Sequence, residues 1–112
     1  MSHRRELPQR RLNQTFTFVH EWEKGKPFQY RCTVGYYEDG ILGEVFLNSL
    51  KHDTSLDANA RDAAVFLSIA LQYGAPLSVL RRAMQRDTEG YAASPLGLAL
   101  DEIARRGLEQ LE

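Results

Sequence analysis

The sequence is poor in cysteine, and its single thiol, Cys32, limits the chemistry open to the chain. One cysteine cannot form an intramolecular disulfide or supply a cysteine-based metal cage, which favours a reducing compartment, and we expect the cytoplasm. Cys32 falls on the apolar side of an alternating segment, where burial disfavours the thiolate, so we expect a core residue. The three histidines, His3, His20 and His52, are scattered without ligand spacing, so no metal site is expected.

Long hydrophobic runs and any excess of charge are also missing. The longest apolar run, residues 63–71, is well below the roughly 20 residues needed to span a bilayer. The first residues carry charge with no apolar stretch behind them, so we expect neither a membrane span nor a signal peptide. With 14 Lys and Arg against 15 Asp and Glu, the charge balance does not indicate a nucleic acid, membrane or acidic partner. No glycine-rich phosphate loop or nucleophile elbow occurs, so the sequence predicts no cofactor and no standard enzyme class.

What the sequence does contain is a run of predicted strands followed by a run of predicted helices. Apolar and polar residues alternate over residues 15–22 and again over residues 28–37, which is typical of strands with one buried face. Asp39-Gly40 predicts a type I′ hairpin turn, because glycine takes a positive φ without steric cost. A third strand, about residues 42–48, completes an antiparallel meander.

Three helices are predicted after the meander. Asp57 can cap the first, whose apolar residues cover most of its circumference, so we expect it to be the buried central helix. Its narrow polar stripe consists of Asp57, Arg61, Ser68 and Gln72. Gly74 ends this helix, a short amphipathic helix covers residues 76–86, and Ser94 caps a third that runs to the end of the chain. This order predicts one α+β domain over residues 13–112, a three-stranded antiparallel meander followed by three helices packed on one face.

Two groups of polar residues are candidates for ligand binding. The first combines cationic groups for an anion with amides and carboxylates for orientation, and its members are Glu44, Asn48, Lys51, His52, Asn59 and Asp62. Asp53 and Asp57 would oppose an anion there, and turn formation with helix capping is the simpler interpretation. The second is a basic N-terminal arm, residues 1–12, whose four arginines could contact phosphate, although a solvated and partly mobile terminus explains them more simply.

The alternative hypothesis is a helix-turn-helix that binds nucleic acid. Residues 69–84 can be laid on that motif, with Arg81, Arg82 and Arg86 available for phosphates or base edges. The pattern is weak, since any tight helical hairpin also needs small residues and a glycine turn. The neutral overall charge argues against this interpretation as well.

Two separated motifs carry a family resemblance. The first is the turn at residues 38–40 leading into "LGEVF", and the second is "SIALQYGAPL", residues 68–77, with Ile69 in place of the usual leucine. Together they resemble the TSCPD domain, found as a C-terminal segment of adenosylcobalamin-dependent ribonucleotide reductases and as small free-standing proteins. The resemblance covers residues 16–105. It departs from the family at Ser94, which stands in place of a cysteine, and at Leu96, which replaces an aspartate.

The resemblance implies an accessory or binding module that engages a reductase subunit, a nucleotide or a second copy of the chain. Ribonucleotide reduction in that superfamily requires a thiyl-forming cysteine, a redox-active cysteine pair and a large barrel. A chain of 112 residues with one cysteine cannot supply them, so we expect no catalytic residue and no autonomous ribonucleotide reduction. The serine at position 94 implies the loss of any cysteine-borne metal site found in longer members.

Overall fold

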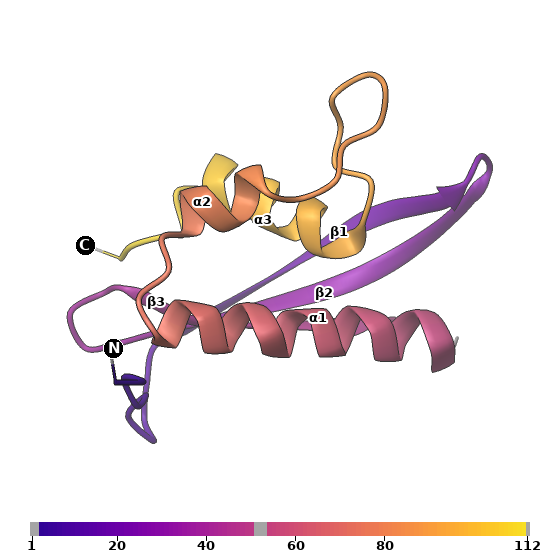
Figure 1. Ribbon diagram of the computed structural model, residues 1–112. Helices are drawn as coiled ribbons and strands as arrows, with labels where there is room; N and C mark the ends of the chain where they lie inside the picture. The colour runs from indigo at the N-terminus through magenta and orange to yellow at the C-terminus, as the bar shows by residue number, and fades with distance from the viewer. Residues whose placement is uncertain (1–2, 51–53, 112) are drawn as a thin grey trace.

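The computed structural model describes residues 3–50 and 54–111, and it has the predicted α+β architecture. Three strands form an antiparallel sheet in the order β1-β2-β3, and their bounds are β1 (Asn13–Glu23), β2 (Lys26–Tyr36) and β3 (Leu42–Ser49). Three helices follow, α1 (Thr54–Gln72), α2 (Leu77–Arg82) and α3 (Pro95–Arg105). The helices cover one side of the sheet, with α1 alongside β3 and α3 over β1 (Figure 1). Within the described residues, no helix combines the length and hydrophobicity needed to cross a membrane.

Alternation along the strands sets the core. On the central strand β2, Tyr30, Cys32 and Val34 are fully buried. The register places Cys32 between Phe16 of β1 and Leu47 of β3, so one row of apolar side chains crosses all three strands. Successive side chains point to opposite faces, so this row faces the helices while the neighbouring row faces away from them. The sheet therefore has one face in the core and one face without a helical cover.

The turn between β2 and β3 differs from the predicted type I′ turn. That turn needs positive φ at both central residues, but in the described chain no residue other than glycine has a positive φ. The Gly40 amide instead donates to the Tyr37 carbonyl (2.9 Å), and Gly40 itself has a φ of +85°. A Cβ on Gly40 would lie 2.2 Å from the Leu111 carbonyl oxygen, so the close approach of the C-terminal segment also requires glycine here.

Two helix ends and one cap differ from the predicted ones. Helix α1 begins at Thr54, so Asp57 lies inside the helix and is not its cap. Helix α2 ends at Arg82, because the following segment turns back on itself through an isolated bridge between Arg86 and Ala92. Helix α3 ends at Arg105, before the left-handed Gly107 (φ +67°). The predicted cap of α3 is confirmed, since the Ser94 side chain accepts a hydrogen bond from the Gly97 amide (3.1 Å).

Helix α1 is oriented differently from the buried central helix that its composition predicts. One apolar row of the helix enters the core, but Val65, Phe66 and Tyr73 are 49%, 75% and 48% exposed. The polar residues Ser68 and Gln72 are buried instead. Their side chains face the outer edge of β3, where backbone groups need hydrogen-bond partners. Ser68 and Gln72 of the polar stripe therefore face inward, while Arg61 stays exposed.

Candidate functional site

The N-terminal arm, residues 3–12, lies against the rest of the domain. The Arg5 amide donates to the Gln72 carbonyl at the end of α1 (2.8 Å), and the Tyr37 hydroxyl donates to the Arg5 carbonyl (2.7 Å). At the other end of the arm, the Tyr36 amide donates to the Leu12 carbonyl (3.1 Å). The arm is thus tied to both the helix and the hairpin, and its arginines are brought to defined positions.

Arg11 forms a paired contact with Glu44 on β3. Its guanidinium donates to both carboxylate oxygens, from Nε to Oε2 and from Nη2 to Oε1 (3.1 Å), and the bond to Glu44 raises the pKa of Arg11. Glu44 is 6% exposed and lies over Gly35, where an added Cβ would come within 2.2 Å of Oε2. Glycine at position 35 therefore makes room for this carboxylate, which neutralises an arm arginine at the sheet face.

Arg5 makes two further contacts near the β2–β3 turn. Its guanidinium carbon lies 3.8 Å from the centre of the Tyr37 ring, and Nη2 lies 3.0 Å from the Asp39 carboxylate. Burial is the main reason that the pKa of Tyr37 is raised. Arg10, by contrast, is exposed, and the structure records no ion pair for it among the described residues. Arg4 is also exposed and without a recorded ion pair there, and its Nε donates to the Gln72 side-chain oxygen (2.6 Å).

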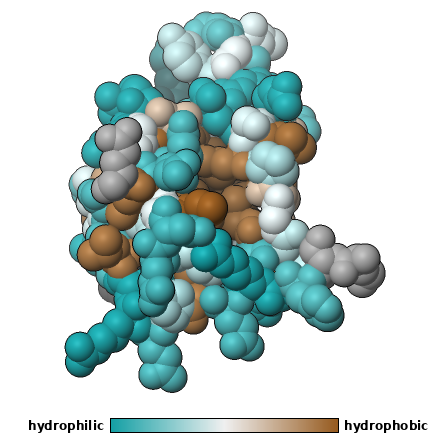
Figure 2. Space-filling model, turned by 90° about the vertical axis from the view of Figure 1, so that its left-hand side faces the viewer, coloured by the Kyte–Doolittle hydropathy of each residue, from teal (hydrophilic) through white to brown (hydrophobic). Residues whose placement is uncertain are grey.

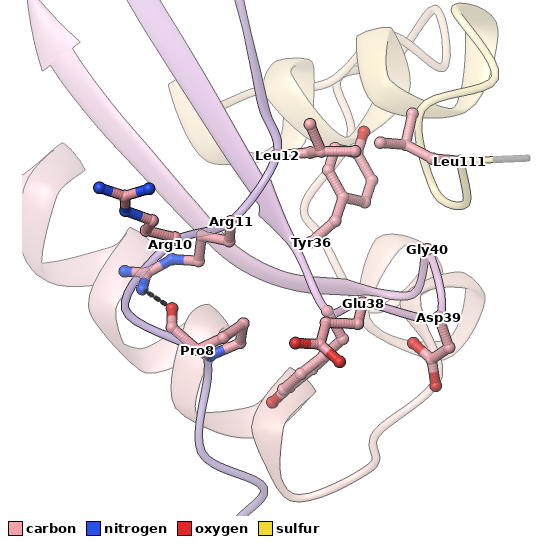
Figure 3. Close-up of a pocket in the computed structure, with 10 residues that line it drawn as sticks. Pro8, Arg10, Arg11, Leu12, Tyr36, Glu38, Asp39, Gly40 and Leu111 are labelled. Atoms are coloured by element: carbon pink, nitrogen blue, oxygen red, sulfur yellow. Dashed lines mark hydrogen bonds between the residues drawn. The ribbon is translucent and has the colours of Figure 1, made fainter.

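A pocket of about 360 Å³ lies between the arm, the turn and the C-terminal segment (Figure 3). Leu12, Tyr36 and Leu111 form its apolar part, while Arg10 and Glu38 supply charge. The Tyr36 hydroxyl donates to the Leu108 carbonyl (2.5 Å), and burial raises the pKa of Tyr36 to about 12. The Tyr36 phenol therefore keeps its proton at neutral pH and is held as the donor to Leu108.

An apolar hollow of about 430 Å³ lies at the end of the domain where α1 leads into α2. Its lining includes Ile41, Leu42, Leu71 and Leu77, with the charged residues Arg5 and Glu109 also present. Figure 2 shows this end of the domain, with hydrophobic side chains in a hollow surrounded by hydrophilic ones. Sequence reasoning missed both this hollow and the arm pocket. The four arginines of the arm were the only signal for either of them.

The predicted ligand-binding group is divided between two sides of the domain. Lys51 and His52 lie outside the described residues, as does Asp53. Glu44 and Asn48 are four residues apart on the sheet face that has no helical cover. Asn59 instead lines a largely apolar hollow of about 280 Å³ between α1 and the start of α3, and Asp62 is exposed on α1. The described members are not brought into one pocket, and a ligand site at this loop stays a prediction.

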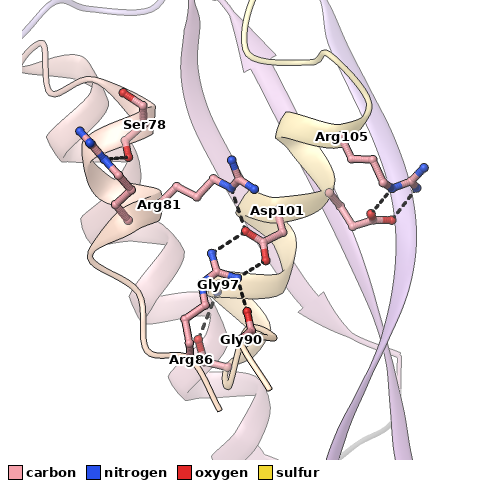
Figure 4. Close-up of polar contacts among 10 residues, drawn as sticks. Ser78, Arg81, Arg86, Gly90, Gly97, Asp101 and Arg105 are labelled. Atoms are coloured by element: carbon pink, nitrogen blue, oxygen red, sulfur yellow. Dashed lines mark hydrogen bonds and ion pairs between the residues drawn. The ribbon is translucent and has the colours of Figure 1, made fainter. Parts of the chain in front are cut away.

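Two of the three arginines of the helix-turn-helix hypothesis, Arg81 and Arg86, contact a carboxylate of α3 (Figure 4). Arg81 Nε and Arg86 Nη2 each lie 2.8 Å from Asp101 Oδ1. The hydrogen bond from Arg86 is the main reason that the pKa of Asp101 is lowered. Arg82 Nε donates to the Ser78 carbonyl (3.3 Å) within α2, a helix of six residues. Two of the three cations therefore share one carboxylate of the same chain, and Arg82 has no ion pair recorded among the described residues.

The described part of the chain contains neither a cluster of metal ligands nor an exposed thiol. No group of three or more His, Cys, Asp and Glu side chains there could hold a metal ion. Cys32 has no exposed surface, and burial raises the pKa of its thiol to about 12. The expectation that Cys32 is a core residue is confirmed.

The exposed apolar residues of α1 form a surface that we call the α1 outer face. It consists of the exposed residues Val65, Phe66 and Tyr73, with the partly exposed Ile69 between them. Phe66, at 75% exposure, is the most exposed of the large hydrophobic side chains described on this helix. Contiguous exposed apolar groups on a folded domain are typical of a surface that another protein covers.

Comparison with known proteins relates the chain to part of a large enzyme. It is 36% identical over 77 residues to the vitamin B12-dependent ribonucleotide reductase of Rhodopirellula baltica, and 34% identical over 77 residues to that of Bradyrhizobium diazoefficiens. Each alignment covers 69% of this chain but only 7% and 6% of the two enzymes. No family model and no solved structure matches the chain. The expected kinship with ribonucleotide reductases is thus confirmed for a short segment of those enzymes.

Proposed function

We propose that the chain is a TSCPD-type accessory module that binds a vitamin B12-dependent ribonucleotide reductase and does not reduce ribonucleotides itself. The α1 outer face is the docking surface in this proposal. The observation that carries it is the 75% exposure of Phe66 on a helix that buries its polar residues Ser68 and Gln72.

The choice of a reductase as partner rests on the relatedness. In the two similar enzymes, the matching segment makes up 7% and 6% of the chain, so most of each enzyme is available to pack against it. If the matching segment packs on the rest of the enzyme through this helix face, the same face would be exposed in the segment taken by itself. Burying a phenylalanine side chain in an interface contributes about 1.5–3 kcal/mol, which is enough for Phe66 to dominate a small contact.

The chemistry of the described residues supports a binding role. The Cys32 thiol is buried and protonated, and the Tyr36 hydroxyl also keeps its proton at neutral pH. The β3 carboxylate of Glu44 is already paired with Arg11 of the arm. The domain exposes apolar and charged side chains to solvent, and such a surface is suited to binding another protein.

The proposal is tested by measuring binding of the full chain to the purified vitamin B12-dependent reductase of the same organism, by biolayer interferometry. Phe66→Asp should weaken binding by at least about tenfold, because it places a charge where an apolar side chain is buried. Tyr91→Asp is the matched control, since Tyr91 is 68% exposed on the loop after α2, away from the α1 outer face. Circular dichroism checks that both variants fold.

Three results would overturn the proposal. One is the absence of binding by the unaltered chain, and another is an equal loss of affinity in both variants. The third is formation of deoxyribonucleotide when the chain alone is incubated with a ribonucleotide, adenosylcobalamin and dithiothreitol.

A further inference from the structure

The two edges of the sheet are treated differently by the fold. At the β3 edge, side chains of α1 form hydrogen bonds with the backbone groups that point away from the sheet. Ser68 bonds to the amide and the carbonyl of Val45. Two further bonds, Asp57 with the Ser49 amide (2.7 Å) and Gln72 with the Gly43 carbonyl (3.0 Å), continue this cover along the strand. An edge covered in this way is closed to another strand.

No side chain of the described residues is recorded as covering the β1 edge in this way. The bond from the Tyr36 amide to the Leu12 carbonyl fixes which backbone groups face β2: those of even-numbered residues do, and those of odd-numbered residues point outward. β1 is the end strand of the sheet, and among the described residues no backbone hydrogen bond outside the sheet is recorded for the outward-facing positions Thr15, Thr17, Val19 and Glu21. All four residues are exposed. A strand of 11 residues thus offers a row of unpaired amides and carbonyls to solvent.

The composition of this strand favours pairing. Residues 13–20, "NQTFTFVH", contain no lysine, arginine, aspartate or glutamate, and no proline or glycine. Exposed edge strands in monomeric proteins are usually protected by charge, proline or a bulge, and here the register shifts only near Glu21 and Glu23. Threonine, phenylalanine and valine also have high strand propensity. The strand therefore has the features of an edge that is paired in the working protein.

We propose that two copies of the chain pair antiparallel through β1 to form a six-stranded sheet with a two-fold axis at Thr17. This register sets Thr15 opposite Val19 of the second copy and Phe16 opposite Phe18 of the second copy. Pairs of aromatic and β-branched residues across strands stabilise such a sheet.

The register also explains why a second copy suits this edge. The outward backbone groups belong to odd-numbered residues in both copies, so a two-fold pairing keeps the even-numbered residues of both on one face. Phe16 and Phe18 of both copies then lie on the face that carries the helices. After pairing, each outer edge of the six-stranded sheet is a β3 strand already covered by α1. The assembly therefore closes at two copies and does not extend into a fibre.

Sedimentation velocity on the full chain tests this proposal, and we expect a species of twice the 12.8 kDa chain mass. Thr17→Lys places two like charges opposite each other at the axis and should raise the dissociation constant at least about tenfold. Phe46→Lys is the matched control, because Phe46 is 46% exposed on the covered strand β3 and faces away from the helices. It should leave the pair intact.

Two more variants test the register itself. Thr17→Pro removes an outward-pointing amide without removing a bond to β2, so it should separate the copies even if Thr17→Lys fails to fold. Thr17→Cys should form a disulfide between copies under mild oxidation, because the two residues face each other at the axis. A chain that stays monomeric at all concentrations would overturn the proposal, and so would dissociation of the pair by Phe46→Lys or a failure of Thr17→Cys to cross-link. A β1 strand that instead binds an extended reductase peptide would overturn it too, and would leave the proposed reductase docking unaffected.

Discussion

The Ser68 hydroxyl bonds to both backbone groups of Val45: it accepts a hydrogen bond from the amide (2.9 Å) and donates one to the carbonyl (3.0 Å). Ser68 is on α1, Val45 is on β3, and both are buried. One side chain thus satisfies two strand-edge groups that would otherwise lack partners in the protein interior. This contact fixes the rotation of α1 about its axis, and that rotation leaves Phe66 in solvent.

Replacing Ser68 by alanine should destabilise the domain. The change leaves the amide and the carbonyl of Val45 without their partner, which costs about 1–3 kcal/mol. Urea unfolding measures the change, and Ser78→Ala on the exposed side of α2 is the control. Equal unfolding midpoints for the two variants would show that water replaces the hydroxyl at no cost.

Replacing Arg11 by methionine should also destabilise the fold, because Glu44 would remain largely buried without its cation. Removing one partner of a fully buried pair costs about 3–5 kcal/mol. The Arg11 side chain is 28% exposed, so solvent screening lowers the expected loss to about 2 kcal/mol. Arg10→Met, at the neighbouring exposed position, should change the free energy of unfolding by less than about 0.5 kcal/mol.

A double-mutant cycle isolates the contact between arm and sheet. Glu44→Gln in the Arg11→Met background removes the unpaired charge, so the double variant should be more stable than Arg11→Met alone. Simple addition of the two single losses would contradict direct coupling between these side chains.

Stability should fall in acid partly through Asp101. The hydrogen bond from Arg86 lowers the pKa of this carboxyl in the folded state, so the unfolded chain binds the proton at a higher pH. The contribution is present above the ordinary aspartate pKa of about 4, and it is lost as pH falls through the lower pKa of the folded state. Urea unfolding from pH 6 to pH 2 should show a shallower decline in Asp101→Asn than in the unaltered chain.

Arg86→Met gives an independent check on the same pair. It removes the first cause of the lowered pKa and should flatten the acid decline in the same direction as Asp101→Asn. A decline remains in both variants, because Arg105 lowers the pKa of Glu102 in a similar way. If the curves of both variants run parallel to that of the unaltered chain, the ion pair has no linked effect.

The elements of the fold could be predicted from local signals, whereas the position of α1 and of the arm could not. Alternation predicted the three strands and their order, and the Ser94 cap is a signal that acts within a few residues. The inward orientation of Ser68 depends on a strand edge 23 residues away. From the sequence alone, a serine that bonds to water cannot be told from a serine that bonds to backbone. The arm is placed by Arg11 and Glu44, which are 33 residues apart, so no local pattern indicates the arm pocket.

Cys32 is the only cysteine in the chain, and it sits without exposed surface on the middle strand, with Phe16 and Leu47 as its neighbours in the sheet. A thiol reagent can reach it only when those neighbours separate. The rate of its alkylation under native conditions, divided by the rate in denaturant, gives the fraction of molecules that are open at any moment. The protein thus carries a natural chemical probe of its own opening, on the strand that pairs with both of the others.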